Sequence, residues 1–472
     1  MPIDTNHLGL YTDFYELAMA QGYFFSKRNK ESAVFDYFFR SNPFNGGFTV
    51  FAGLQDFLDM LSNFRYSSSD IEYLSKQGFK KKFLDYLTNF QFSGTLFSMN
   101  EGELIFPNQP IMRIEGNILE CQLIESLLLN ILNFESLIAT KAFRIKLVSG
   151  DRPFTDFGLR RGQGFGALHA SRAACIGGAQ STSNVLAGKI FNIPVSGTQA
   201  HSWIQSFDNE LEAFRTFAEV HPDNTVLLVD TFDTLKSGIP NAIKVAKEME
   251  KNSQKLKAIR LDSGDLAYLS KKARKMLDDV GLDYIKIVAS NQLNEHVIKS
   301  LLKDQDAKID AFGIGTELIT GKTDAALDGV FKLAEVNSVP KMKLSENIEK
   351  VTLPGKKQVY RFYDEEGLFF RDAVLKENEN PDELKFIYHP VHPEKFTGLY
   401  KLKYEKLLNK VFDNGNVIHQ QKSLSDIHNY LINRANKLPD EHKRFISPHI
   451  YKVGISKKLM EIRNKLKNKL EQ

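Results

Sequence analysis

The sequence predicts a protein of the α/β class, in which a β/α barrel that need not be complete is combined with a discontinuous α+β domain. Between about residues 153 and 335, short apolar segments alternate with stretches of helical periodicity, an order typical of parallel strands joined by crossover helices. Segments rich in aromatic and β-branched residues precede and follow this region, as expected for a mixed domain. A chain of 472 residues, 42% of them apolar, can form two or three domains.

Residues 1–150 are expected to form the N-terminal α+β domain. Asp13 and Glu16 resemble a capping pair that opens a helix through Ala20. Strands are predicted over 34–39, 48–51, 95–97 and 111–114, followed by a long helix over about 119–147.

The barrel is expected over residues 151–340. Its strands are predicted at 154–157, 193–196, 225–229, 258–261, 284–289 and 309–314. The intervening helices, such as 242–249 and 266–277, are amphipathic, as an outer ring packed on a barrel requires. An open nucleotide-binding sheet shows the same alternation and is the alternative to the favoured barrel.

The last part of the chain divides into two expected regions. Residues 341–400 return to short strands and turns and are expected to rejoin the N-terminal domain, whereas 401–472 are expected to be mainly helical. Basic residues near the end alternate with apolar ones at helical spacing, which predicts the solvated face of a terminal helix. They are Lys457, Lys458, Arg463, Lys465, Lys467 and Lys469.

Composition excludes several classes of protein. The formal charge of +4 is small for this size and gives no reason to expect a nucleic-acid partner. The first residues lack an export signal, and the longest apolar stretch, 123–132, contains Glu125 and is too short to span a membrane. Cys121 and Cys175 are far apart without metal-ligand spacing. They indicate a reducing, cytoplasmic location and buried structural roles.

Polar or glycine-rich clusters follow five of the predicted strands. In a β/α barrel, the active site is assembled at the carboxyl ends of the strands. Clusters at these positions can therefore reach one ligand from several sides. They occupy residues 156–161, 196–202, 229–234, 259–265 and 313–317.

Two kinds of residue in these clusters suit an anionic ligand. Gly313, Gly315 and Thr316 open onto a predicted helix, where backbone amides and a hydroxyl can hold a phosphate, although a tight turn has the same pattern. Arg160 and Arg260 can each hold a carboxylate or phosphate with paired donors. A structural ion pair is the alternative for both arginines.

Three aspartates and one histidine complete the candidates. Asp230, Asp262 and Asp265 can hold ribose hydroxyls or a Mg²⁺ ion that gathers phosphate oxygens, and each taken singly can instead cap a helix. His201 follows a glycine-threonine turn and can act as a nucleophile or general base. A lone histidine is otherwise more often a structural group.

Seven segments in this chain resemble the nicotinate phosphoribosyltransferase family, in the same order and over about residues 9–373. Several long matches in the right order are not explained by chance. The segments are TDFYELAMAQGYF from Thr12, FDYFFRSNPFNGGFTVFAGL from Phe35, DFGLRRGQG from Asp156, STSNVLAG from Ser181, SGTQAHSW from Ser196, RLDSGDL from Arg260 and FGIGTEL from Phe312.

The resemblance implies an enzyme of NAD synthesis that joins nicotinate to the ribose of phosphoribosyl pyrophosphate, with Mg²⁺ and coupled hydrolysis of ATP. His201 matches the family's histidine that ATP phosphorylates transiently. The family also forms homodimers with shared active sites, and Tyr15 matches the tyrosine that reaches nicotinate from the partner subunit.

Other matched positions line the same pocket. Phe157 matches the aromatic residue expected on the other face of the pyridine ring. Thr198 and Arg260 match positions that line the nicotinate and phosphoribosyl pocket, and Thr316 matches one that binds phosphoribosyl pyrophosphate. Arg160, Asp262 and Gly315 are assigned to that pocket as well.

The alternatives differ in what their sites require. The related nicotinamide-using family places an aspartate near the pyridine substituent, whereas residues 182–185 contain no acid, which favours a carboxylate substrate. A non-catalytic sugar-phosphate-binding protein would lose the histidine or the arginines. An aldolase-like barrel would normally need a lysine or a catalytic carboxylate at a strand end, and the five clusters contain no lysine.

Overall fold

In the computed structural model, which describes residues 5–344 and 352–471, the chain passes twice through one structural unit. The first unit comprises Met1–Thr140 and Ala326–Gln472, and the second comprises Lys141–Ala325. The chain thus enters the second unit ten residues before the expected boundary at 150 and leaves it before 341. The residues of the expected region 401–472 lie in the first unit, together with the N-terminal residues.

The first unit contains a seven-stranded sheet in the order β13-β12-β1-β5-β3-β19-β20. Its central strand β1 pairs antiparallel with both β5 and β12, so Ala33 lies opposite both Gly116 and Val336. Segments about 300 residues apart in the chain therefore share one sheet. The strands are β1 (Ser32–Phe39), β3 (Thr95–Ser98), β5 (Met112–Asn117), β12 (Gly329–Val336), β13 (Val339–Pro340), β19 (Asn409–Asp413) and β20 (Asn416–Val417).

A second sheet of this unit has the order β17-β16-β21-β15-β14-β18. Its strands are β14 (Lys357–Tyr363), β15 (Phe369–Lys376), β16 (Phe386–Tyr388), β17 (Phe396–Gly398), β18 (Tyr404–Lys406) and β21 (Val453–Ile455). Two helices, α15 (Leu424–Lys437) and α16 (Lys457–Leu470), follow or flank the last strands. A further short pair joins β2 (Thr49–Val50) to β4 (Leu104–Ile105).

The prediction that 401–472 is mainly helical is confirmed only in part. The region contains α15 and α16, but it also contributes β18, β19, β20 and β21 to two sheets. These strands are two to five residues long, too short to show a period-2 pattern. Their partners β14, β3 and β15 lie far away in sequence, so local sequence does not reveal the pairing.

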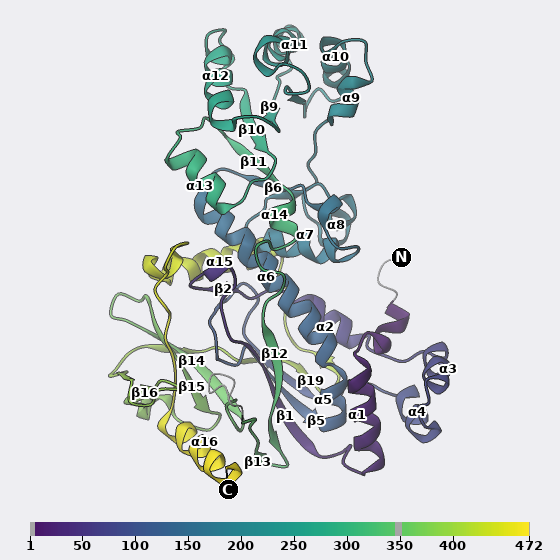
Figure 1. Cartoon of the computed structure of the whole chain (residues 1–472), viewed down its shortest axis with the longest axis vertical. Coiled ribbons are helices and arrows are strands. Elements are labelled where there is room, and N and C mark those ends of the chain that lie inside the picture. The colour runs from purple at the N-terminus through teal and green to yellow at the C-terminus, as the bar shows by residue number, and fades with distance from the viewer. Residues whose placement is uncertain (1–4, 345–351, 472) are drawn as a thin grey trace. The chain divides into compact units, whose positions relative to one another are not determined.

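Helices cover the seven-stranded sheet, and α1 (Phe14–Phe25) packs on α5 (Ile118–Leu123) (Figure 1). The expected capping pair does not form, because the Glu16 carboxylate accepts hydrogen bonds from Thr12 and Ser126 instead. The predicted helix 119–147 is divided at Ile124 into α5 and α6 (Glu125–Ser149). The other helices here are α2 (Leu54–Ser62), α3 (Ser68–Lys76) and α4 (Lys81–Thr88).

A buried ion network lies beside the apolar core of the first unit. The Arg361 guanidinium, which is fully buried, donates to both oxygens of Asp372 at 2.8 Å, to Glu103 Oε1 at 2.5 Å and to the Leu104 carbonyl at 2.9 Å. Arg434 Nε also donates to Glu103, at 2.9 Å. Each buried charge thus has an opposite charge and directed hydrogen bonds, without which burial is costly.

Replacing Arg361 with methionine should lower the free energy of unfolding by about 3–5 kcal/mol, because Glu103 and Asp372 would stay buried without their main partner. Urea denaturation followed by circular dichroism measures this change. Arg215→Met is the matched control, since the Arg215 pair with Glu248 is exposed and such pairs contribute little. Equal effects of both substitutions would contradict a stabilising role for the buried network.

The second unit contains six parallel strands in the order β7-β6-β11-β10-β9-β8. They are β6 (Phe154–Asp156), β7 (Ser181–Thr182), β8 (Val226–Leu228), β9 (Ala258–Leu261), β10 (Lys286–Ser290) and β11 (Ala311–Ile314). The connecting helices include α7 (Gly166–Gly177), α8 (Val185–Phe191), α10 (Glu210–Val220), α11 (Ile239–Lys251), α12 (Leu266–Asp278) and α13 (Glu295–Lys303) (Figure 1).

The described strands of the second unit form an open sheet, with no backbone pairing between its edge strands β7 and β8. The predicted strand 193–196 forms a single parallel bridge, Val195 to Thr182, beside β7 at one edge. The chain then reaches the opposite edge, where Gln199 Nε2 donates to the Val226 carbonyl of β8 at 3.4 Å. A closed barrel would need backbone hydrogen bonds that link this edge to the opposite one. Among the described residues, the Gln199 side chain makes a contact at β8, and no backbone pairing joins β8 to β7.

Both cysteines are buried, as expected from the sequence. Burial, followed by the charge of Asp156, raises the pKa of Cys175 to about 12, so the thiol stays protonated at neutral pH. Within the described ranges, no helix is long and apolar enough to cross a membrane.

Candidate active site

The carboxyl ends of the parallel strands carry a polar network centred on Arg260, the third residue of β9. Its Nη1 donates to Thr198 Oγ1 at 2.5 Å and its Nε donates to Ser290 Oγ at 3.0 Å. Its Nη2 lies 3.3 Å from Asp262 Oδ1, and its guanidinium carbon stands 5.7 Å from the centre of the Phe157 ring. One side chain thus contacts residues from four strand ends.

Strand geometry explains where this arginine points. Ala258, Ile259 and Leu261 of β9 are buried, whereas the Arg260 side chain keeps 14% of its surface exposed. A short strand between two neighbours leaves one residue near its carboxyl end free to extend over the edge. The fork of donors then fits several acceptors at once, which a lysine would not do.

His201 joins this network as the first residue of the short helix α9 (His201–Gln205). Its Nδ1 lies 3.0 Å from Thr231 Oγ1 and its Nε2 lies 3.8 Å from Asp262 Oδ2. When Nδ1 donates to Thr231, Nε2 retains its lone pair, the form that a nucleophile requires. The side chain is 40% exposed, so a dissolved substrate can reach it. We call the whole group the strand-end network: Phe157, Thr198, His201, Thr231, Arg260, Asp262 and Ser290.

The three candidate aspartates have different roles. Asp230 is buried, and its Oδ2 accepts from the Asp262 amide at 2.8 Å and from Ser263 Oγ at 2.6 Å. Asp262 accepts from Ser290 and faces both Arg260 and His201. Asp265 caps α12 by accepting from the Tyr268 amide at 2.9 Å, the structural alternative stated above. Its assignment as a metal ligand therefore has no support in the geometry.

Asp156 holds the neighbouring strand ends together rather than facing a ligand. Its oxygens accept from the Gly158 amide at 2.7 Å and from the Ser171 and Thr182 hydroxyls at 2.8 Å each. Complete burial raises the pKa of this carboxyl, and the three hydrogen bonds oppose the shift. The arrangement fixes the ends of β6 and β7 beside Phe157.

The glycine-rich turn after β11 packs against Phe157. A side chain at Gly313 would meet the Phe157 ring at 2.3 Å, and one at Gly315 would meet the Phe157 carbonyl at 3.3 Å. Thr316 begins the four-residue helix α14 (Thr316–Ile319) and is exposed. Arg160 is exposed in a short 3-10 turn (Leu159–Arg161) outside the strand-end network.

Tyr15 belongs to the first unit and lies on α1. Its ring is 47% exposed, and burial of the rest, with Glu125 as the next cause, raises the pKa of its hydroxyl. Met19, four residues further along α1, lies on the same side of the helix as Tyr15. The exposed residues on and just before α1 are Tyr11, Phe14, Tyr15, Met19 and Phe25.

Sequence reasoning missed Ser290 and did not single out Thr231. Ser290 is the last residue of β10, a sixth strand end at which no cluster was sought. It accepts from Arg260 and donates to Asp262. Applying the strand-end rule to every predicted strand would have found it.

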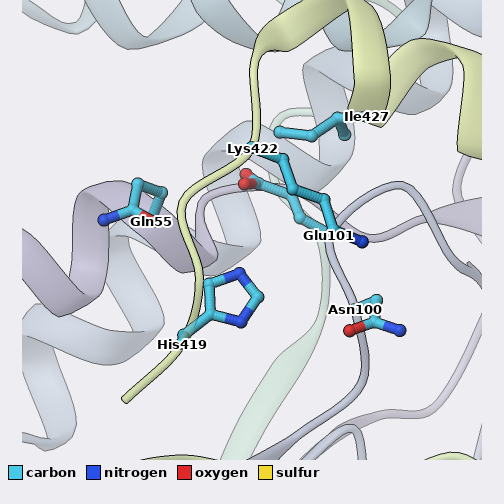
Figure 2. Close-up of a pocket in the computed structure, with 6 residues that line it drawn as sticks. All are labelled: Gln55, Asn100, Glu101, His419, Lys422 and Ile427. Carbon is cyan, nitrogen blue, oxygen red and sulfur yellow. The ribbon is translucent and has the colours of Figure 1, made fainter. Parts of the chain in front are cut away.

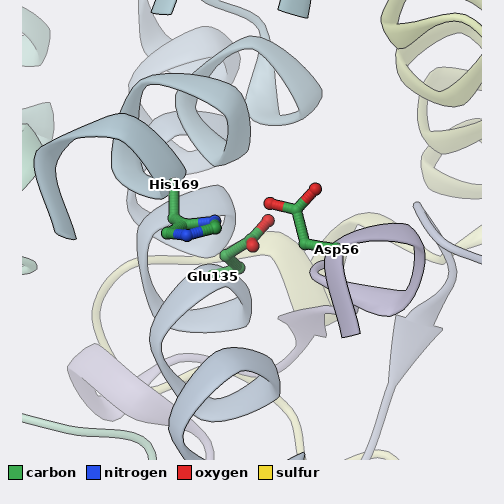
Figure 3. Close-up of side chains that lie close together, drawn as sticks. All are labelled: Asp56, Glu135 and His169. Carbon is green, nitrogen blue, oxygen red and sulfur yellow. The ribbon is translucent and has the colours of Figure 1, made fainter. Parts of the chain in front are cut away.

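Two further groups of polar side chains lie in the first unit, away from the strand-end network. One of them surrounds a space of about 10 Å³, which has room for one water molecule and no substrate (Figure 2). Its lining residues are Gln55, Asn100, Glu101, His419, Lys422 and Ile427. The carboxyl groups of Asp56 on α2 and Glu135 on α6 approach within 4.8 Å of each other (Figure 3). Both carboxyls are buried.

Comparison with known proteins places the chain among full-length relatives. Residues 10–133 match the family model described as the nicotinate phosphoribosyltransferase N-terminal domain, and residues 356–463 match the model of its C-terminal domain. The chain is 44% identical to nicotinate phosphoribosyltransferase of Bacillus subtilis, with 98% of each chain covered. It is 31% identical to the Homo sapiens protein of the same name, covering 97% of this chain and 96% of that one.

Solved structures share the fold. The crystal structure of human nicotinic acid phosphoribosyltransferase matches with a TM-score of 0.86 and 28% identity, covering 96% of this chain and 99% of that one. Nicotinate-nucleotide pyrophosphorylase from Pyrococcus furiosus matches with a TM-score of 0.72 and 26% identity, covering 93% and 97%. The strand-end network lies between the two family models in sequence, in a part of the chain that these full-length matches span.

Replacing Gly313 with alanine should destabilise the second unit by about 1–3 kcal/mol, the usual cost of overpacking, because the Phe157 ring must move. Thermal denaturation followed by fluorescence of Trp203, the single tryptophan, would report this change. Gly197→Ala is the control, since nothing lies within 4 Å of its added carbon. A Gly313 variant as stable as the control would show that the contact with Phe157 is easily relieved.

Proposed function

Since the chain belongs to the nicotinate phosphoribosyltransferase family, we propose that it forms nicotinate mononucleotide and pyrophosphate from nicotinate and phosphoribosyl pyrophosphate. This reaction is a step of NAD biosynthesis. The observation that carries the proposal for this chain is the convergence of Arg260, Asp262 and His201 at one edge of the sheet. A cation, a carboxylate and a nucleophilic imidazole stand there within reach of one ligand.

The proposed reaction is a displacement at the anomeric carbon of the ribose. The pyridine nitrogen forms the new bond to this carbon as the bond to the pyrophosphate oxygen breaks, and the electron pair leaves with pyrophosphate. The protein need not bond to the sugar. It has to align the nitrogen, stabilise the departing negative charge and exclude water from the cationic centre.

The residues have distinct parts in this proposal. Arg260, with Thr198 held at 2.5 Å, faces the phosphates or the nicotinate carboxylate. Phe157 stands beside the guanidinium and offers a face for the pyridine ring. The Gly315–Thr316 turn, next to Phe157, supplies donors for the phosphoribosyl group, and exposed Arg160 adds a second cation at the rim.

The acidic pair fits Mg²⁺, which prefers oxygen ligands and binds substrate phosphates. Asp230 is buried, and its Oδ1 has no hydrogen-bond partner among the residues that the structure describes. Asp262 lies directly beside it, since its amide donates to Asp230 Oδ2. These two carboxylates would hold the ion, which would draw charge from the pyrophosphate oxygens.

ATP coupling is proposed to proceed through His201. Nε2 would form a bond to the γ-phosphorus of ATP as ADP leaves, and water would later break the phosphorus–nitrogen bond to give inorganic phosphate. The contact of Nδ1 with Thr231 at 3.0 Å is compatible with the tautomer that this attack requires, in which Nδ1 carries the proton. A phosphate at this position can change substrate affinity only if it interacts with the bound substrates differently from the bare ring.

Nicotinate rather than nicotinamide is the proposed base. Residues 182–185, which follow β7 at the same edge, contain no carboxylate. The hydroxyl of Thr182 donates to Asp156 and the side chain of Asn184 caps α8. An acid there would repel the carboxylate of nicotinate, so its absence supports the acid substrate.

A homodimer is proposed because the aromatic side of α1 has large apolar side chains in contact with solvent. A second copy of this chain would cover that surface and receive Tyr15 beside its own Phe157. Exposed apolar surface of this kind marks interaction sites. A cytoplasmic location agrees with two buried, unpaired thiols.

The direct test is to incubate the purified protein with nicotinate, phosphoribosyl pyrophosphate and Mg²⁺, with and without ATP. Nicotinate mononucleotide should form, and nicotinamide offered in the same assay should react far more slowly. Product from nicotinamide at an equal rate would refute the proposed specificity. Absence of either mononucleotide would refute the transferase itself.

Replacing His201 with alanine should abolish the stimulation by ATP and leave some uncoupled transfer, because the phosphate acceptor is lost while Arg260 and Phe157 remain. The rate of product formation with and without ATP measures this. His221→Ala, a change outside the strand-end network, should keep the stimulation. Full stimulation in the His201 variant would remove this residue from the coupling step.

Replacing Tyr15 with alanine should raise the KM for nicotinate by about tenfold, the loss expected when an aromatic contact of about 1–1.5 kcal/mol is removed. Tyr15→Phe retains the ring and should stay near the wild-type value. Mixing the inactive Arg260→Ala chain with the Tyr15→Ala chain should recover activity with the wild-type KM for nicotinate, because a hybrid dimer contains one intact site. No recovery on mixing would contradict a shared site.

A further inference from the structure

The first unit contains a large cavity whose charged lining residues are mainly basic. Its volume is about 1390 Å³, more than the roughly 300–1,000 Å³ of ordinary small-molecule sites. The acidic residues in that lining are Asp36 and Asp328, and Asp36 pairs with Lys357 at 2.8 Å. The proposed transferase chemistry does not use this cavity.

Five basic side chains form one wall of the cavity, and we call them the α16 basic cluster. They are His389, His392 and Lys395, from the loop between β16 and β17, and Arg463 and Lys467, from α16. Arg463 Nη1 donates to the Pro390 carbonyl, which holds the loop against the helix (Figure 1). Arg463 and Lys467 are four residues apart and therefore share one helical face.

This wall corrects the expectation that the basic residues of the last helix form a solvated face. Lys457, Lys458, Lys465 and Lys469 are exposed, but Arg463 and Lys467 are half-buried and face the cavity. Arg463 and Lys467, four residues apart, thus face the cavity, whereas the lysines between and after them face solvent. The division between cavity-facing and solvent-facing cations cannot be read from the alternation of lysine and leucine.

The electrostatics of the cluster favour a bound anion. Lys395 and Arg463 have no carboxylate partner within residues 5–344 and 352–471, and burial lowers the pKa of Arg463. The pKa of His389 is also lowered, first by burial and then by His392, Lys395 and Arg463, against the opposing effect of Glu394. His389 Nδ1 accepts from the amides of Val391 and His392, so the charges that remain near it are those of Lys395 and Arg463. An anion between these two cations would be attracted by both.

Two acids outside the cavity lining pair with members of the cluster. Glu394 lies 3.4 Å from His392 Nδ1, and Glu471 lies 3.7 Å from Lys467. Neither glutamate belongs to the described lining of the cavity. The basic member of each pair, His392 or Lys467, lines the cavity, whereas the acidic member does not.

Aromatic side chains stand beside the cations. Tyr388 and Phe396 line the cavity at the two ends of the loop, with ring centres 6.2 Å apart. Flat rings beside a group of cations suit a ligand that has both a planar base and phosphates.

We propose that this cavity is a second anion site, separate from the strand-end network, which binds a nucleoside polyphosphate. The phosphates would lie on the α16 basic cluster and the base against Tyr388 and Phe396. Inorganic pyrophosphate shares the phosphate chemistry and is the alternative source of the charge. The site does not depend on the proposed transferase activity.

The experiment is calorimetric titration of the full chain with ATP and with pyrophosphate. It is done in the Arg260→Ala background, so that binding at the strand-end network is weakened. The added double variant Lys395→Ala/Lys467→Ala should bind ATP about tenfold or more weakly, because charge-assisted hydrogen bonds to phosphate are lost. Lys465→Ala/Lys469→Ala is the matched control, with the same charge change on exposed residues outside the cavity lining.

Three further results separate the outcomes. ATP should bind more tightly than pyrophosphate, and equal affinities would overturn the assignment to a nucleotide. Identical isotherms for the two double variants, or no binding at all, would overturn the site. With Arg260 intact, the Lys395→Ala/Lys467→Ala variant should keep its transferase activity. Loss of anion binding at the cavity can therefore be distinguished from loss of the transferase reaction.

Discussion

The candidate active site depends on the Arg260 guanidinium. Thr198, Ser290, Asp262 and Phe157 come from four different strand ends, and each contacts this one planar cation. The parallel sheet makes the meeting possible, because the carboxyl ends of all its strands lie along one edge. Hydrogen bonds with fixed directions then hold loops that would otherwise move independently.

The same physical rule explains which parts of the site could be predicted from sequence. A strand end is a local feature, so Phe157, Thr198, His201, Arg260 and Asp262 could be selected from the residues and from the family resemblance. Their mutual contacts are not local, and neither is the choice between capping a helix and facing a ligand. Asp265 and Asp262 stand three residues apart after the same strand, yet one caps α12 and the other faces Arg260.

The fold shows a similar limit. Strands with buried neighbours on both sides, such as β9, were predicted with their observed bounds because the apolar run itself marks them. The strands after residue 401 were missed because all are short, and β18, β19 and β21 pair with segments far away in sequence. Glu16 is a single residue for which a contact far away in sequence also decides the outcome. Its spacing from Asp13 suits a local cap, but tertiary contact with Ser126 takes its carboxylate instead.

The position of His201 suggests how a phosphate could alter substrate binding. A phosphoryl group on Nε2 would place negative charge close to Asp262 Oδ2, which lies 3.8 Å from that nitrogen. Like charges at this distance repel, so the Asp262 carboxylate would be displaced from its present position, where Oδ1 faces Arg260 at 3.3 Å. The guanidinium would then have fewer internal partners and more capacity for substrate oxygens. Coupling by differential binding requires such a shared partner, and Asp262, between the imidazole and the arginine, is placed to serve as one.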